Sequence, residues 1–289
     1  EENQMPNLLT PENIPLIILA FIWIIGAILQ DLKRREVDNI WNFSLIAFAL
    51  AYRIAISIHT QNYTFALNGI LGFIIFITLG NALYYGRVFA GGDAKLLISL
   101  GTILPLSYDW IINLKIFLSF TGLFLLGGAV YVLIWSIILT IIHFQNFKTE
   151  FTKQFNIYRK LHKRAFILIF IALISATIFQ SYYLIPIIIL FAFFPILFLF
   201  AKSVEEACMI KTTNPQKVTE GDWLYKDIKV QNKTIKATWE GVTKEQLQLI
   251  KAKYKKDILI KQGIPFTPGF LIGLIALLIL TEKGLFGIF

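Results

Sequence analysis

Long apolar runs recur along this chain, and they restrict its possible folds more than any other feature. About eight of them approach the length of about 17–25 residues that a helix needs to cross a bilayer. Their approximate positions are 13–31, 40–58, 64–85, 92–106, 116–143, 163–180, 182–201 and 266–281. Only 16% of the residues are charged, whereas soluble domains have about a quarter. The sequence therefore predicts an all-α polytopic membrane protein with about eight transmembrane helices.

The first run could be mistaken for a secretory signal. It has no basic segment before it, and it ends in Asp31-Leu-Lys-Arg-Arg35 rather than at a small-residue cleavage site. We therefore expect it to be a retained transmembrane helix.

The basic residues indicate how these helices are oriented. If the N-terminus lies outside, the inner connections are 32–39, 86–91, 144–162 and 202–265, and each of them contains Lys or Arg. The outer connections contain only Lys115 among Lys and Arg. This asymmetry follows the positive-inside rule and predicts a multi-pass protein of the cytoplasmic membrane with its N-terminus outside. It also accounts for the net charge of +9 without a nucleic-acid partner.

The composition changes near the C-terminus, and this change suggests three regions. Residues 1–201 are expected to form a transmembrane core, and 266–289 a final transmembrane helix. The polar stretch 202–265 between them is expected to be a small cytosolic α+β module, which is too small to be an enzyme by itself. Its single cysteine, Cys208, is the only one in the chain, which argues against a disulfide framework and against a zinc site of paired cysteines. We expect no metal and no cofactor.

Local signals predict the elements of this small module. Asp222–Trp239 alternates in the manner of a β-hairpin, with its turn at 231–233. Thr243-Lys-Glu-Gln246 has the pattern of a capping box that opens a short helix, 244–254. Residues 258–260 are apolar and predict a closing strand.

Two acidic residues lie at the cytosolic edges of predicted spans. Asp31 ends the first span and Asp93 begins the fourth. The first span descends towards the cytosol and the fourth ascends from it, so both carboxylates should lie at the same depth near the inner face. Taken singly, Asp31 could pair with a neighbouring arginine and Asp93 could be a helix N-cap. Taken together, they suggest a functional site, because acidic groups inside a membrane are costly.

Two carboxylates at one depth have a known chemical use. Like charges at short range do not both ionise easily, so one holds a proton while the other acts as a base. The base can activate a water while the acid polarises a peptide carbonyl, which is the aspartic-protease reaction and needs no metal. Gly91 and Gly92, just before Asp93, would let a substrate backbone approach closely.

The segments around the two aspartates are similar to the motifs of a known family. Gln30-Asp31-Leu-Lys-Arg-Arg-Glu-Val-Asp-Asn39, followed by Ala90-Gly-Gly-Asp93-Ala-Lys95, resembles the type IV prepilin peptidases, which are GxGD-type intramembrane aspartic proteases. The archaeal preflagellin and prepilin peptidases are the branch it resembles most. Asp31 and Asp93 match the catalytic positions. Ala90 departs from the pattern, because it stands where the motif has its first glycine.

This resemblance implies an activity and a substrate. The protein is expected to remove the short basic leader, or signal peptide, from prepilin or preflagellin (archaellin) precursors at the cytosolic face of the bilayer. Lys95 could steady a carboxylate or a substrate carbonyl, or else only reach towards the membrane surface. Glu36 and Asp38 could bind the basic leader, or else be solvated. Pro265 and Pro268 could line the substrate groove, or else mark a plain helix start.

Two other classes of function remain open. The aspartates could form the ion pathway of a transporter, although that reading favours polar residues through the bilayer centre, where this sequence has few. The chain could also be a non-catalytic assembly factor. A presenilin-like protease is a poorer match, because Tyr108-Asp109 comes after Asp93 rather than before it.

Overall fold

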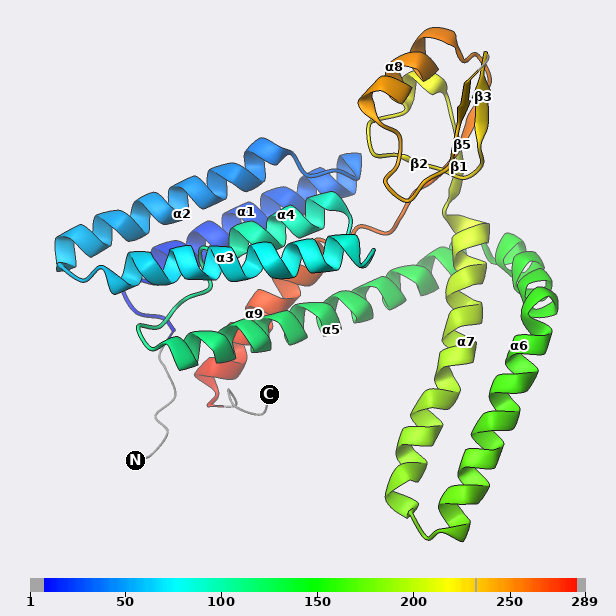
Figure 1. Cartoon of the computed structure of the whole chain (residues 1–289), viewed down its shortest axis with the longest axis horizontal. Coiled ribbons are helices and arrows are strands. Elements are labelled where there is room, and N and C mark those ends of the chain that lie inside the picture. Colours follow the sequence, from blue (N-terminus) through cyan, green and yellow to red (C-terminus); the bar gives the residue numbers. More distant parts are fainter. Residues whose placement is uncertain (1–7, 232, 285–289) are drawn as a thin grey trace. The chain divides into compact units, whose positions relative to one another are not determined.

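The structure, a computed structural model, describes residues 8–231 and 233–284, and these are mainly helical (Figure 1). The chain divides into two compact units. The first runs from the N-terminal helix to Leu133 and resumes at Ile264, and the second is Ile134–Gly263. One long helix, α5 (Trp110–Ile142), contributes residues to both units.

The first unit begins with four helices that pack against their neighbours in the chain. These are α1 (Ile14–Arg34), α2 (Asn39–Thr60), α3 (Thr64–Tyr85) and α4 (Gly91–Leu100). Successive helices run in opposite directions, so the end of α1 and the start of α4 lie at the same end of the bundle (Figure 1). The last helix, α9 (Pro268–Glu282), returns to this unit and packs against α1.

Six of the described helices are long and apolar enough to cross a membrane, so the chain is a multi-pass membrane protein. They are α1, α2, α3, α5, α6 (Phe144–Ile178) and the segment Tyr182–Cys208. The other two predicted spans, 92–106 and 266–281, correspond to α4 and α9, which have only 10 and 15 residues. A helix of 10 residues extends over about 15 Å, roughly half the hydrocarbon thickness.

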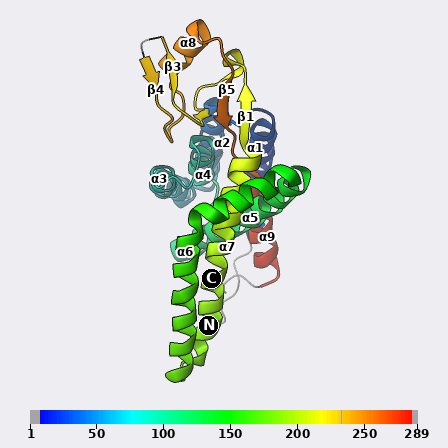
Figure 2. The same ribbon diagram turned by 90° about the vertical axis from the view of Figure 1, so that its right-hand side faces the viewer.

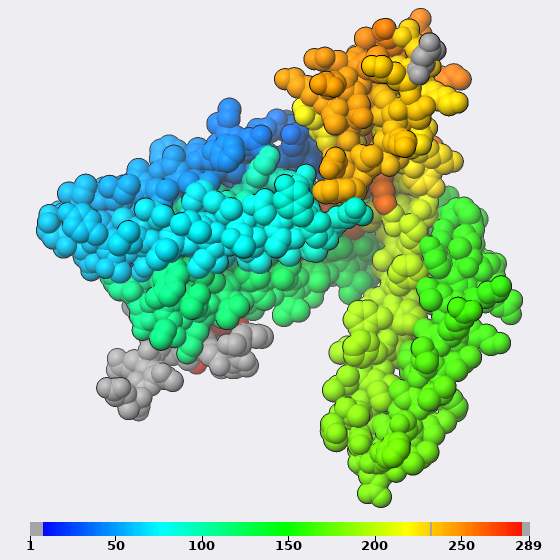
Figure 3. Space-filling model, in the orientation of Figure 1, coloured from blue at the N-terminus to red at the C-terminus, as the bar shows by residue number. Residues whose placement is uncertain are grey.

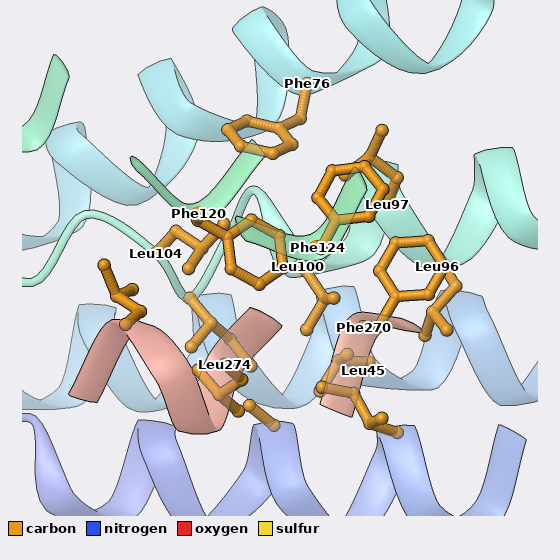
Figure 4. Packing of buried hydrophobic residues seen from close by; sticks show 14 of the residues in the cluster. Leu45, Phe76, Leu96, Leu97, Leu100, Leu104, Phe120, Phe124, Phe270 and Leu274 are labelled. Atoms are coloured by element: carbon orange, nitrogen blue, oxygen red, sulfur yellow. The ribbon is translucent and has the colours of Figure 1, made fainter. Parts of the chain in front are cut away.

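Leucine and phenylalanine side chains from five helices fill the core of the first unit. Leu45, Phe76, Leu100, Phe120 and Phe270 come from α2, α3, α4, α5 and α9, and they converge in the view of Figure 4. Glycines allow α5 and α9 to approach closely. A Cβ on Gly269 would lie 2.8 Å from the Cα of Gly128, and one on Gly273 would lie 2.7 Å from the Cα of Phe124. Small residues favour such backbone contact between helices in a bilayer.

Arg53, in α2, explains why α4 can be so short. Its guanidinium is fully buried and donates hydrogen bonds to four backbone carbonyls. Three of these carbonyls, of Thr102, Ile103 and Pro105, follow the last turn of α4, at 2.7 to 2.9 Å. Carbonyls at a helix end need partners, and a buried end without them is costly. Arg53 supplies those partners where α4 stops.

The second unit is built around two antiparallel helices, α6 and α7 (Ile185–Cys208), joined through a short 3-10 turn, η1 (Tyr182–Leu184). They touch along their length (Figure 3). Residues 144–162, predicted as a connection, are helical and form the first half of α6. Aromatic residues lie among the lysines of this half and pack against α7. The ring centroids of Phe147 and Phe200, for example, are 5.7 Å apart.

A small α+β module follows α7 in the same unit, as predicted. The strands β1 (Ile210–Thr213), β5 (Ile258–Lys261) and β2 (Trp223–Leu224) form one antiparallel sheet in that order, and β3 (Ile228–Val230) pairs with β4 (Lys233–Ile235) (Figure 2). A 3-10 turn, η2 (Pro215–Lys217), and the helix α8 (Lys244–Lys253) complete it.

The local signals in the module gave mostly correct predictions. The Thr243–Gln246 capping box is present, the hairpin forms at β3 and β4, and the closing strand is β5. Trp223 was expected in the hairpin, but it lies in the other sheet and pairs with Lys261. The module is tied to the end of α7, where Tyr225 donates a hydrogen bond to Glu206. This bond raises the pKa of Tyr225.

Candidate active site

Asp31 lies in the last turn of α1, one turn before the helix ends. The helix stops because Arg35 adopts a left-handed conformation and its backbone N–H bonds to the carbonyl of Asp31. The Asp31 side chain is only 8% exposed, and the charge of Arg35 acts on it. A buried carboxylate needs hydrogen-bond donors in place of water.

Thr267 supplies such a donor from the far end of the sequence. Its Oγ1 hydroxyl donates to Oδ2 of Asp31 at 2.9 Å, and its backbone N–H approaches the same oxygen at 3.5 Å. Thr267 is fully buried and immediately precedes α9. The start of α9 therefore fixes the orientation of the Asp31 carboxyl group.

Asp93 lies in the first turn of α4. Its carboxyl group interacts with the backbone of Ala90, and the negative charge of Asp31 acts on it. The two aspartates therefore lie near each other at one end of the first unit, as the order of the helices predicts. Asp93 is also the only acidic residue in the first turn of α4, where the helix dipole favours negative charge.

An aromatic cluster holds the loop that leads to Asp93. The ring of Phe89 lies 5.3 Å from Phe266 and 5.8 Å from Phe124, measured between ring centroids. Phe124 in turn stacks on Phe270 at 4.9 Å with an interplanar angle of 10°. Phe266 and Phe270 flank the residue that binds Asp31, so the beginning of α9 contacts the segments that carry both aspartates.

The two motif segments also touch directly. Nζ of Lys95 donates to Oδ1 of Asn39 at 2.6 Å, which joins the second turn of α4 to the first residue of α2. A Cβ on Gly92 would lie 3.5 Å from the backbone nitrogen of Val37, which is ordinary contact. Lys95 thus binds the end of the first motif in this structure, and the carboxylates are not its hydrogen-bond partners.

The remaining predicted site residues have varied surroundings. Asp38 accepts a hydrogen bond from Arg34 at 2.7 Å, with both side chains about half exposed, while Glu36 is exposed. Pro268 occupies the first turn of α9, which is a common helix start, and Pro265 is buried. A Cβ on Gly91 would come no closer than 3.7 Å to Tyr84.

Sequence reasoning missed two residues near Asp31, Thr267 and Tyr131. Thr267 lies between Pro265 and Pro268, the two prolines predicted to line the substrate groove. A threonine at this position matches no sequence motif, so its bond to Asp31 was not predicted. Tyr131, in α5, interacts electrostatically with both Asp31 and Arg35. Among the residues that the structure describes, no group of three or more His, Cys, Asp or Glu side chains could hold a metal ion.

These features define the class of the protein: a multi-pass helical membrane protein with two neighbouring carboxyl groups at one end of a helix bundle. Comparison with known families then gives a match over part of the chain. Residues 18–145 match the type IV leader peptidase family. The segment contains both Asp31 and Asp93.

Two archaeal proteins are similar to part of this chain. A preflagellin peptidase of Methanococcus maripaludis is 37% identical over 89 residues, which cover 30% of this chain and 38% of that protein. A preflagellin peptidase of Methanocaldococcus jannaschii is 32% identical over 88 residues, or 30% of this chain and 37% of the relative. The match thus spans less than two-fifths of either relative. No solved structure matches the chain.

Proposed function

We propose that this protein is a membrane-embedded aspartic endopeptidase that removes the short basic leader from prepilin or preflagellin (archaellin) precursors. The observation that carries the proposal is that α1 and α4 bring Asp31 and Asp93, two carboxyl groups within the segment that matches the family, to the same end of the bundle (Figure 1). Two such groups can share one proton, which gives the pair an acid and a base at the same time.

The reaction follows from this pair. The ionised aspartate takes a proton from a water, and the resulting hydroxide attacks the carbonyl carbon of the scissile peptide bond. The protonated aspartate gives its hydrogen to the carbonyl oxygen, forming a neutral tetrahedral intermediate. Collapse of that intermediate transfers a proton to the leaving nitrogen and breaks the C–N bond. Thr267 would keep the Asp31 carboxyl correctly oriented through these steps.

The substrate class follows from the surroundings of the pair. A precursor of this kind has an apolar helix preceded by a basic leader, so the helix could enter from the bilayer while the leader stays in the cytosol. Glu36 follows the end of α1 that carries Asp31, is exposed, and could bind a basic side chain. Asp38 could do the same by exchanging its exposed partner, Arg34, because such surface pairs contribute little stability.

The proposed topology has the N-terminus outside and the two aspartates near the cytosolic face. All eight predicted segments then lie in the membrane, with α4 and α9 as shorter members whose ends are covered by neighbouring helices. We further propose that 1–201 and 266–289 form the membrane region, and that 202–265 is a cytosolic module that docks the leader or the membrane surface. Removing the module while cleavage of a full precursor persists would contradict that docking role.

A cleavage assay tests the proposed function. The purified chain is incubated in detergent with pilin-like and archaellin-like precursors, and the products are identified by mass spectrometry. The proposal predicts one cut between the basic leader and the apolar helix, unaffected by metal chelators. A transporter or an assembly factor would leave every precursor intact, and cleavage abolished by chelation would contradict the aspartic mechanism.

A further inference from the structure

Asn42 is an exception among the buried polar side chains of the first unit. It is 0% exposed, yet neither its Nδ2 nor its Oδ1 has a hydrogen-bond partner among residues 8–231 and 233–284. Two other buried asparagines of this unit are satisfied: Asn13 donates to the carbonyl of Leu106 and Asn68 to that of Ser107.

An unpaired buried amide lowers the stability of the folded protein. Burying an amide without a hydrogen bond destabilises the folded state, and a leucine of similar volume would avoid that cost. Local violations of this kind tend to occur at functional sites, where a group is kept for what it does rather than for stability.

The helices place Asn42 at the level of the aspartate pair. The buried face of α2 carries Asn42, Leu45, Ala49 and Arg53, and Arg53 bonds to the carbonyl of Thr102, just past α4. Asn42 lies 11 residues before Arg53, a rise of about 16 Å, and Asp93 lies 9 residues before Thr102, about 14 Å. Because α2 and α4 start at the same end of the bundle, the two residues are about level (Figure 1).

Neighbouring contacts leave the start of α2 little freedom to move. Asn39 is bonded to Lys95, two residues beyond Asp93. Trp41 stacks on Trp23 of α1 at 5.2 Å, and each indole N–H donates to the other's backbone carbonyl. Asn42 therefore lies on a turn of α2 that is held against both α1 and α4, which suits a residue that must position another group.

We propose that Asn42 is a positioning residue of the active site: its carboxamide N–H donates to the carboxyl group of Asp93 during the reaction and fixes its orientation. The inference rests on the proposed peptidase function and adds a third side chain that acts through one of the two aspartates. Asn42 itself, being fully buried, does not touch the substrate.

Replacing Asn42 with leucine separates this role from a structural one. The Asn42→Leu variant removes the unpaired amide and keeps its volume, so the melting temperature should stay the same or rise. The kcat for precursor cleavage should fall about tenfold or more, the loss expected for one hydrogen bond made in the transition state. KM should change little, and the pH–rate profile should move because the surroundings of Asp93 change.

Asn68→Leu is the matched control, since it removes a satisfied buried asparagine at the other end of the bundle. It should lower the melting temperature and leave kcat and the pH profile unchanged.

Wild-type kcat and pH profile in Asn42→Leu would overturn the inference. If leucine prevents folding, Asn42→Ala and Asn42→Ser provide the same comparison. Failure of this inference alone would leave Asp31→Asn and Asp93→Asn inactive, whereas cleavage by those variants would contradict the peptidase proposal itself.

Discussion

The hydroxyl of Thr267 donates a 2.9 Å hydrogen bond to the carboxyl group of Asp31, across 236 residues of sequence. This bond connects the start of the last helix to the end of the first. Thr267 lies outside the segment 18–145 that matches the family, so the part of the chain beyond that match contributes directly to the candidate site.

Removing the Thr267 hydroxyl should lower activity more than stability. Thr267→Val keeps the shape of the side chain and deprives Asp31 of its donor. A hydrogen bond to a charged group contributes about 1.5–3 kcal/mol, so the cleavage rate should fall about 10- to 100-fold. Thr267→Ser retains a hydroxyl and should keep most of the activity. Equal rates in the valine and serine variants would show that the bond has no role in catalysis.

The Lys95–Asn39 contact should couple the two motifs energetically. In a double-mutant cycle with Lys95→Met and Asn39→Leu, each single change should reduce the cleavage rate. The double variant should then be little worse than the worse single one, because both remove the same bond. Additive losses would mean that Lys95 acts separately from Asn39, for example on the substrate carbonyl.

Arg53 should be needed for stability. Arg53→Met leaves four buried carbonyls without their donor and should lower the free energy of unfolding by at least about 3 kcal/mol. The effect can be followed as the melting temperature in detergent. Arg34→Gln is the surface control, and loss of its exposed pair with Asp38 should cost less than about 1 kcal/mol. Similar melting temperatures in the two variants would refute this account of α4.

The close approach of α5 and α9 should be sensitive to a single methyl group. A Cβ on Gly273 would lie 2.5 Å from the Cβ of Phe124, so Gly273→Ala should cost about 1–3 kcal/mol. The displaced α9 would carry Thr267 away from Asp31 and lower activity as well. The control is Gly122→Ala in α5, where a Cβ has nothing within 4 Å and should be harmless. Normal activity and stability in Gly273→Ala would contradict this packing argument.

The sequence predicted the helical membrane class and the small module because both depend on local patterns. An apolar run that crosses the bilayer must form a helix whatever its position in the sequence. The capping box at Thr243 likewise needs only four consecutive residues. The same reasoning put Asp31 and Asp93 at one depth, since the order of the spans alone determines at which face each helix begins and ends.

Other features depended on contacts between distant segments and could not be predicted. The short length of α4 follows from Arg53, which is about 50 residues away from the carbonyls it binds. Thr267 has no motif of its own, and its role appears only when α9 packs beside α1. The helical first half of α6 was missed because its lysines and arginines were interpreted as those of a connection.

The two aspartates themselves offer the most direct test. Wild type, Asp31→Asn and Asp93→Asn are purified in the same detergent, checked for equal melting behaviour, and compared in cleavage of one full-length precursor. The account predicts that each substitution lowers the cleavage rate by about 100- to 10,000-fold, because each removes one half of an acid–base pair. A folded Asp31→Asn or Asp93→Asn protein that cleaves the precursor at the wild-type rate would contradict it.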